Sequence, residues 1–96
     1  MNITQPTAFV LQALARGHAY GFEIMQATGL PSGTVYPLLR RLERAGCAAA
    51  HWEDEHSAHR EGRPPRRQYR ITARGRQALA ACLERFAFVR DAVPVR

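Results

Sequence analysis

Three arginines between residues 33 and 46 share one face of a predicted helix. Arg40 and Arg44 are four positions apart and Arg41 lies beside them, so at about 100° per residue their guanidinium groups point the same way. The opposite face carries apolar residues at the i, i+3, i+4 and i+7 spacing of a buried stripe, namely Val35, Leu38, Leu39 and Leu42. Such a helix buries one side and offers cations on the other. A basic outer face is more often simply solvated, so the helix alone does not define a function.

No catalytic arrangement accompanies these cations. Ser32 and Ser57 are the only serines, and neither lies in a motif that would make it a nucleophile. No glycine-rich phosphate loop follows a predicted strand. The sequence therefore predicts a protein that is not an enzyme and that carries no cofactor.

Histidines near the middle of the chain raise the question of a metal site. His51, His56 and His59 lie among acidic residues in this segment, which are Glu53, Asp54, Glu55 and Glu61. Their spacing matches no compact ligand set, and the two Cys or His pairs of a structural zinc site are missing. We therefore expect a hydrated loop and no bound metal. His18 precedes a predicted helix and is expected at the surface or at the helix start.

The charge of the chain favours a polyanionic partner. Its 14 basic residues are all arginines, and with 8 acidic residues they give a formal net charge of +6. The charge is uneven, because residues 62–77 hold six arginines and no acid, whereas residues 51–61 hold four acids and one arginine. A local basic patch is expected.

The length of 96 residues predicts one domain with a modest core. No apolar run is long enough to span a membrane, and no signal peptide begins the chain, so we expect a cytoplasmic protein without a membrane partner. Cys47 and Cys82 lie within apolar patterns and are expected to be reduced core or interface residues.

The elements that would position the arginines follow from apolar periodicity and from the glycines. Residues 4–16 form a first predicted helix, with Pro6 in its first turn and Gly17 as its stop. Residues 20–27 form a second helix, which Gly29 closes. The basic helix then follows after a short turn.

Ser32 is expected to cap the basic helix by accepting a hydrogen bond from a free amide, and Gly46 to end it in the left-handed conformation. Pro37 lies inside this helix, removes one helical hydrogen bond and favours a kink. Two helices joined by a short turn, the second one basic, are typical of a helix-turn-helix unit, which places a recognition helix in the major groove of DNA.

Residues 47–55 and 66–71 are predicted to form two strands around a long polar loop, which together make a wing. The first strand is weakly encoded, because small residues that favour helices begin it. The alternative is that the basic helix continues past Gly46. Trp52 on this strand is expected to anchor the core, the commoner role of a lone strand tryptophan.

A last helix is predicted to begin at Thr72 and to carry a nearly heptad apolar stripe, formed by Leu79, Cys82, Leu83, Phe86, Val89 and Val93. Alanines between these positions would let a second helix approach closely. The stripe exceeds what one small domain covers, so we expect it to be the interface of a homodimer. The alternative is that it only packs under the first helix.

Three blocks of the sequence, in this order and spacing, carry a resemblance to a known family. They are Gly21 to Ile24, Gly33 to Pro37, and Gly62 to Pro64 followed by Tyr69 to Thr72. These blocks resemble the motifs of the PadR family of transcriptional regulators, with Phe22 in place of Tyr and Val35 in place of Leu. The resemblance covers about residues 5–80. It implies a mainly α fold with a small β-hairpin (α+β), in which a winged helix-turn-helix domain at 1–75 precedes a C-terminal dimerisation helix at 76–96.

The resemblance further implies a homodimeric regulator, usually a repressor, that binds an operator in double-stranded DNA. Thr34, Tyr36 and Arg63 match family motifs and are expected to contact DNA. Further contacts to DNA bases or backbone are expected for residues that face outward, carry a positive charge or lie near a helix start. These residues are Tyr20, Ser32, Gly33, Arg40, Arg41, Arg44, Arg66 and Arg67.

Two other possibilities remain open at this stage. A winged-helix module can use a basic face and an apolar stripe to bind protein within a larger assembly. A small-molecule effector is compatible with either function, since aromatic residues of some relatives stack on ligands, and Trp52 is the residue of that type here. The sequence identifies neither the operator nor an effector.

Overall fold

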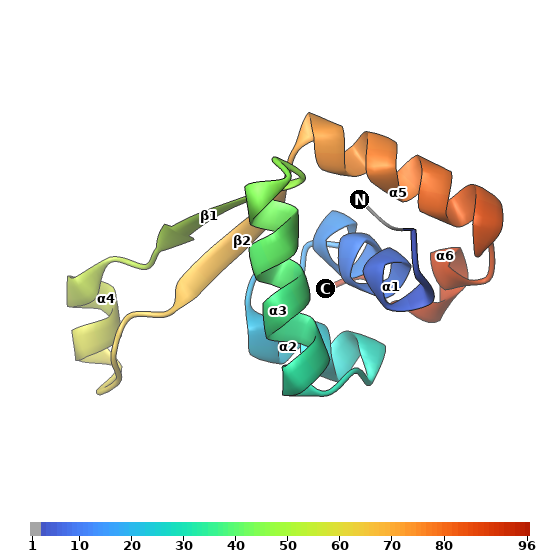
Figure 1. The fold of residues 1–96 in the computed structure, drawn as a ribbon. Coiled ribbons are helices and arrows are strands. Elements are labelled where there is room, and N and C mark those ends of the chain that lie inside the picture. The colour runs from blue at the N-terminus through green and yellow to red at the C-terminus, as the bar shows by residue number, and fades with distance from the viewer. Residues whose placement is uncertain (1–2) are drawn as a thin grey trace.

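The computed structural model describes residues 3–96. Six helices and two strands follow one another in the order α1 (Gln5–Ala15), α2 (Gly21–Thr28), α3 (Ser32–Arg44), β1 (Ala48–Trp52), α4 (Glu55–Arg60), β2 (Arg67–Ile71), α5 (Ala73–Arg85) and α6 (Val89–Ala92). Figure 1 shows a helical body from which the two strands and α4 project to one side.

Helix α1 is the centre of the core, where it contacts α2, α3, α5, α6 and β2. It is apolar around most of its surface, and Val10, Leu11 and Ala13 are fully buried. Leu39 and Leu42 of α3 join the same core, as do Cys82 and Val89 from the C-terminal part. The predicted DNA-binding domain (1–75) and the predicted C-terminal helix (76–96) therefore share one core.

Helix α3 ends where the sequence predicts. Gly46 has a φ of 77°, its amide donates to the carbonyl of Glu43 at 3.0 Å, and the amide of Cys47 donates to Leu42 at 2.8 Å. This pair of bonds closes the last turn and turns the chain into β1, so the helix does not continue past Gly46.

The predicted start of α3 is wrong in one detail. Ser32 is the first helical residue and caps nothing, because Pro31 occupies the capping position and no side chain bonds there. Pro37 lies within the helix, and the carbonyl that loses its amide partner is that of Gly33. Gly33 is exposed near the helix start, so water can hydrate this carbonyl, which explains why the proline is tolerated.

The wing is an antiparallel pair of strands, β1 and β2, in which Ala48 lies opposite Ile71 and Trp52 opposite Arg67. The loop predicted between its strands is instead interrupted by α4. Asp54 caps this helix by accepting from the amide of Ser57 at 3.2 Å, and Gly62, with a φ of 72°, ends it. The tip of the wing is therefore a helical turn, as the left side of Figure 1 shows.

The prediction that Trp52 anchors the core is wrong. Its side chain is 62% exposed on the wing, where the guanidinium carbon of Arg67 lies 5.4 Å from the centre of its ring. The small residues at the other end of β1 explain the difference. Ala48 packs into the core where β1 leaves the helical body, and the strand has left the body by the time it reaches Trp52.

The C-terminal stripe is not one long helix, and this expectation is corrected. Helix α5 ends at Arg85, the chain reverses, and α6 packs against α1. Four of the six residues expected at a dimer interface are buried within the chain itself, namely Leu79, Cys82, Val89 and Val93. Leu83 and Phe86 are partly buried against the same core.

Polar side chains of the N-terminal helices hold this reversal in place. Gln12 and Arg16 both donate to the carbonyl of Arg90, at 2.9 and 2.7 Å. The ring Nε2 of His18, a buried residue, lies 2.8 Å from the carbonyl of Pro94. The carbonyls in and after the short helix α6 thus accept hydrogen bonds from side chains on and after α1. The expectation of a surface position for His18 is wrong.

Helices α2 and α3 with the β1–β2 hairpin form a winged helix-turn-helix, and the predicted fold of mainly helices with a small hairpin is confirmed. None of the helices in the described part of the chain has the length and apolarity that crossing a bilayer requires. Cys47 and Cys82 are free and buried, as predicted, and burial raises the pKa of the Cys82 thiol.

Candidate nucleic-acid interface

The two faces of α3 lie as the sequence predicts. Val35, Leu38, Leu39 and Leu42 are buried, whereas Arg40, Arg41 and Arg44 are exposed. Among residues 3–96 no carboxylate lies within ion-pair distance of these three arginines. The only acid within the helix, Glu43, instead pairs with Arg67 of β2 at 2.7 Å. The outer face of α3 therefore presents uncompensated positive charge.

The start of α3 is open. No side chain caps it, so amides of its first turn are left for an external acceptor. Ser32 and Gly33 are exposed there, and Thr34 is half-buried. A Cβ added at Gly33 would meet nothing within 4 Å, so nothing in the packing of the chain requires a glycine at this position.

Tyr36 joins α3 to α2. Its ring lies against the backbone of Gly21, leaves no room there for a Cβ, and remains 38% exposed. The ring also lines a hollow of about 230 Å³ between the helix-turn-helix and the wing, together with Tyr20, Gly21, Phe22, Arg66, Arg67 and Tyr69. Tyr36 can therefore support the helix pair and still meet a partner.

Aromatic rings and arginines alternate where the wing meets α2. Tyr20 and Phe22 stack with centroids 5.6 Å apart and planes within 9° of parallel. The guanidinium carbon of Arg66 lies 5.2 Å from the Tyr20 ring centre and 4.8 Å from that of Phe22. Such contacts hold the planar guanidinium group of Arg66 at the surface in a fixed orientation.

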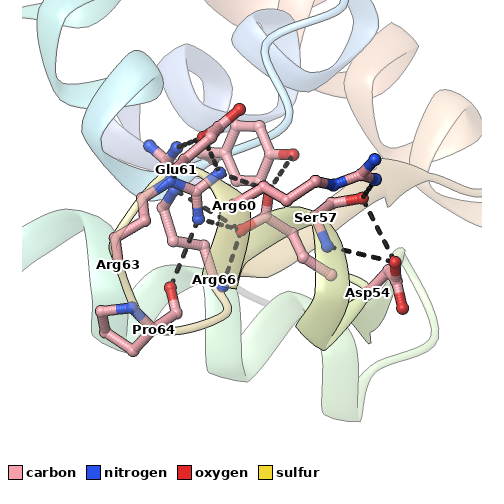
Figure 2. Close-up of polar contacts among 9 residues, drawn as sticks. Asp54, Ser57, Arg60, Glu61, Arg63, Pro64 and Arg66 are labelled. Atoms are coloured by element: carbon pink, nitrogen blue, oxygen red, sulfur yellow. Dashed lines mark hydrogen bonds and ion pairs between the residues drawn. The ribbon is translucent and has the colours of Figure 1, made fainter.

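Glu53 directly follows β1 and is the centre of a hydrogen-bond network at the outer end of the hairpin, beside α4. Figure 2 shows polar contacts of this region, with Glu61, Arg63 and Arg66 labelled. The two carboxylate oxygens of Glu53 accept from Arg63 Nη1 at 2.6 Å and Nη2 at 2.9 Å. The amide of Arg66 donates to the same carboxylate at 2.8 Å, and the hydroxyl of Tyr20 at 3.1 Å. The wing is thereby bonded to Tyr20, the residue directly before α2.

These bonds set the protonation of the network. The Arg63 guanidinium, assisted by the Arg66 amide and the Tyr20 hydroxyl, lowers the pKa of Glu53 to about 2, although burial acts in the opposite direction. Burial, and then the hydrogen bond to the Glu53 carboxylate, raises the pKa of Tyr20. The carboxylate is therefore charged and the phenol is neutral near pH 7.

The residues predicted to contact DNA thus fall into two groups. The arginines of α3 are exposed and have no ion pair, whereas Arg63, Arg66 and Arg67 of the wing are ion-paired with Glu53, Glu61 or Glu43. The hydroxyl of Tyr20 is also occupied. No sequence signal singled out Glu53 or Glu43, because only the register of the hairpin and the crossing of α3 bring them to their arginines.

The histidine-rich segment does not gather its side chains. His51, His56 and His59 are exposed, and no group of three or more potential ligands able to hold a metal occurs within residues 3–96. The absence of a structural metal stays a prediction.

A second surface lies on the side of the helical body away from the wing. A groove of about 560 Å³ is lined by α1, α5 and the start of α6, with Gln12, Ala80 and Leu83 among its residues. Nearby, Phe88 is 54% exposed and its ring meets that of Phe9 edge-on at 6.0 Å.

Residues 10–81 match the sequence profile of the family described as "Transcriptional regulator PadR-like family". A comparison with curated proteins gives no significant match.

Solved structures share the fold. A PadR family transcription regulator from Clostridium difficile R20291 has a TM-score of 0.73 and 22% identity, over 90% of this chain and 91% of that chain. A PadR family transcriptional regulator from Eggerthella lenta DSM 2243 has a TM-score of 0.64 and 26% identity, over 88% and 76%. BpsR of Bordetella bronchiseptica, whose DNA binding is regulated by 6-hydroxynicotinic acid, has a TM-score of 0.73 and 19% identity, over 92% and 59%.

Proposed function

The chain belongs to the PadR-like family of transcriptional regulators, and we propose that it is a sequence-specific repressor that binds an operator in double-stranded DNA as a homodimer. Helix α3 enters the major groove, and the wing lies along the flanking backbone. A protein with this role works in the cytoplasm, where it meets the chromosome.

The observation that carries the proposal is the outer face of α3. It combines three exposed arginines with no paired acid and an uncapped helix start. Guanidinium groups form bidentate hydrogen bonds with phosphate oxygens and guanine edges, and free amides at a helix start bind phosphate.

Gly33 supports the same role. A helical glycine costs about 0.5 to 1 kcal/mol relative to alanine, and no packing in the described chain offsets this cost. A glycine that the chain does not need is explained if a partner's backbone comes within van der Waals contact of it. Ser32, Gly33 and Thr34 are therefore proposed to lie at a DNA phosphate or base edge, with Tyr36 beside them.

Dimerisation is proposed to use the groove formed by α1, α5 and α6. The small, exposed Ala80 lines the groove and permits close approach of a second copy, and Leu83 supplies apolar surface beside it. Phe88 is exposed two residues before Arg90, which also lines the groove. Two linked half-sites would then be bound together, which raises the affinity for a paired operator.

The solved BpsR structure concerns DNA binding that responds to 6-hydroxynicotinic acid. Adding this compound to the binding assay below tests whether a small aromatic acid changes the affinity of the present chain for DNA.

The experiment is to select duplexes from a random pool with the purified protein, and to measure binding of an enriched and a scrambled duplex at several salt concentrations. We expect preference for the enriched duplex and a steep fall of affinity with salt, because counterions are released from the phosphates. If no duplex is enriched and binding to a protein partner, insensitive to salt, is found instead, the chain is an interaction module and the proposal is wrong.

A further inference from the structure

Every guanidinium nitrogen of Arg63 is already bonded within the wing. Nε donates to Glu61 at 2.9 Å, Nη1 donates to Glu53 and to the carbonyl of Pro64, and Nη2 donates to Glu53 and lies 2.7 Å from Glu61. Figure 2 shows the side chain turned inward among these acceptors. A phosphate could bind Arg63 only if one of these bonds, to a carboxylate or to the Pro64 carbonyl, were broken.

The charges within the Glu53 network cancel. Arg63 and Arg66 each lie within ion-pair distance of both Glu53 and Glu61, so two cations face two anions and their sum is zero. Arg40, Arg41 and Arg44 of α3 have no ion pair in the described structure, and neither do the exposed Arg60 and Arg70 of the wing. The structure thus neutralises the two arginines beside Glu53, whereas the arginines of α3 keep an uncompensated charge.

Glu53 is built into the fold more deeply than Glu61. The Glu53 side chain is 12% exposed and the Glu61 side chain 61%. Glu53 also accepts from the amide of Arg66 and the hydroxyl of Tyr20, and its own amide donates to the Arg66 carbonyl at 2.9 Å. It therefore fixes the wing to α2 as well as binding the arginines.

We propose that Glu53 is a specificity-determining residue, which withholds Arg63 and in part Arg66 from DNA phosphates and holds the wing in place against α2. Because phosphate contacts carry no sequence information, removing wing cations from them lets the contacts of α3 dominate the choice of DNA. The inference rests on the proposed DNA-binding function and replaces the expectation that Arg63 contacts phosphate.

The test uses the full chain and four single variants. Glu53→Gln removes the charge and keeps the shape, and Glu55→Gln is its matched control, because it changes the net charge equally at an exposed position without an ion pair in the described structure. Arg63→Gln tests the arginine itself, and Arg40→Gln is the reference for loss of a proposed phosphate or base contact. Binding to the enriched duplex and to a scrambled duplex is measured between about 50 and about 200 mM salt.

We expect Arg63→Gln to leave the salt dependence as in the parent, whereas Arg40→Gln lowers the slope by roughly 0.9 if Arg40 contacts a phosphate. Glu53→Gln should steepen the slope by roughly 0.9 for each arginine released, which adds about 3.5-fold to the loss of affinity over this salt range. It should also tighten binding to the scrambled duplex and reduce the preference for the enriched one. Glu55→Gln should do neither.

Two outcomes overturn the proposal. One is a fall of about 0.9 in the slope of Arg63→Gln, since Arg63 would then contact phosphate. The other is an equal effect of Glu53→Gln and Glu55→Gln, since net charge would then explain both.

A measurement without DNA separates this proposal from the proposed function. The Arg66 amide donates a hydrogen bond to the Glu53 carboxylate. Its hydrogen exchange should be faster in Glu53→Gln and unchanged in Glu55→Gln. If the parent binds neither duplex, the DNA-binding function fails and the specificity role fails with it, whereas the exchange still decides whether Glu53 holds the wing. Unchanged exchange in Glu53→Gln, with DNA binding intact, overturns the role of Glu53 alone.

Discussion

The ring of Tyr36 occupies the space that Gly21 leaves empty at the crossing of α2 and α3. A Cβ at Gly21 would lie 2.7 Å from the hydroxyl oxygen of Tyr36 and closer still to its ring carbons. Gly21 is the first residue of α2, and Tyr36 lies in the exposed half of α3. The absence of a side chain at Gly21 therefore lets the Tyr36 ring pack against the start of α2, beside the proposed DNA surface.

Replacing Gly21 by alanine should force the ring or the helix to move. We expect Gly21→Ala to lower the free energy of unfolding by about 1 to 3 kcal/mol, the usual cost of overpacking. In a Tyr36→Ala background the same change should cost much less, because the conflicting ring is gone. Urea denaturation of the two single variants and the double variant measures the coupling energy between the two positions. An equal cost of Gly21→Ala in both backgrounds would show that the contact with Tyr36 is not the cause of the destabilisation.

Much of this architecture follows from local sequence. The periodicity of Val35, Leu38 and Leu42 fixes which face of α3 is buried, and Gly46 marks where the helix must end, as the structure confirms. Local signals for α4 were also present, since Asp54 is a good cap and Gly62 a good terminator. The polar composition of this segment concealed them, and a loop was predicted instead.

Other features depend on tertiary contacts that no local pattern contains. Neither glycine nor proline interrupts the segment from Arg76 to Val93, so the break after Arg85 follows from burial of Val89 and Val93 against α1 and from the donors of Gln12 and Arg16. The network of Glu53 likewise exists only because the hairpin register places it beside residues ten and thirteen positions later.

The arginines of α3 should determine which DNA is bound. If Arg40 or Arg44 contacts a base, changing it to alanine should cost about 1 to 3 kcal/mol of binding free energy on the enriched duplex, and much less on a scrambled one. Both residues are exposed and unpaired in the described structure, so neither change should alter stability by more than about 0.5 kcal/mol. Fluorescence anisotropy with both duplexes measures this. Equal losses on the two duplexes would assign these arginines to the backbone.

The dimer surface can be tested without disturbing the core. Val89 is not a suitable site for this test, because it is fully buried in its own chain, and a charged side chain there would disturb folding rather than dimerisation. Ala80 is exposed and lines the groove, so Ala80→Arg should block a second copy sterically and leave the helix intact. We expect sedimentation velocity to show a monomer with weaker DNA binding. Gln77→Arg, on the same helix but outside the groove, should remain dimeric, and an unchanged dimer for Ala80→Arg would place the interface elsewhere.

The stability of the chain should carry a signature of Glu53 in acid. Its pKa is about 2 when folded and near the ordinary 4.5 when unfolded, so the unfolded state binds the proton more readily. The stabilisation by its charge is therefore complete above the unfolded pKa and is lost as pH falls through the folded pKa. The difference in stability between the parent and Glu53→Gln should be constant above about pH 5.5 and shrink between pH 4.5 and about 2. Urea denaturation across this range measures it, and parallel curves throughout would contradict the prediction.

Two glycines at opposite ends of α3 should respond in opposite ways to alanine. Gly46 has a φ of 77°, a left-handed conformation that costs a non-glycine residue about 1 kcal/mol or more. Gly33 lies within the helix with open space around it, so alanine there should raise the free energy of unfolding by about 0.5 to 1 kcal/mol. Thermal and urea denaturation should therefore show one destabilised and one stabilised protein.

Binding to the enriched duplex should reverse this order. Gly46→Ala leaves the outer face of α3 unchanged, so its folded fraction should bind with the parent's affinity. Gly33→Ala adds a methyl group where we propose that the DNA backbone comes into contact with the helix, and a clash of this kind should weaken binding about 10-fold or more although the protein is more stable. Because the gain in stability excludes misfolding as the cause, a lower affinity would locate the contact at the start of α3. Parent-like affinity in Gly33→Ala would mean that DNA does not approach this turn, and the proposed orientation of the helix would have to be abandoned.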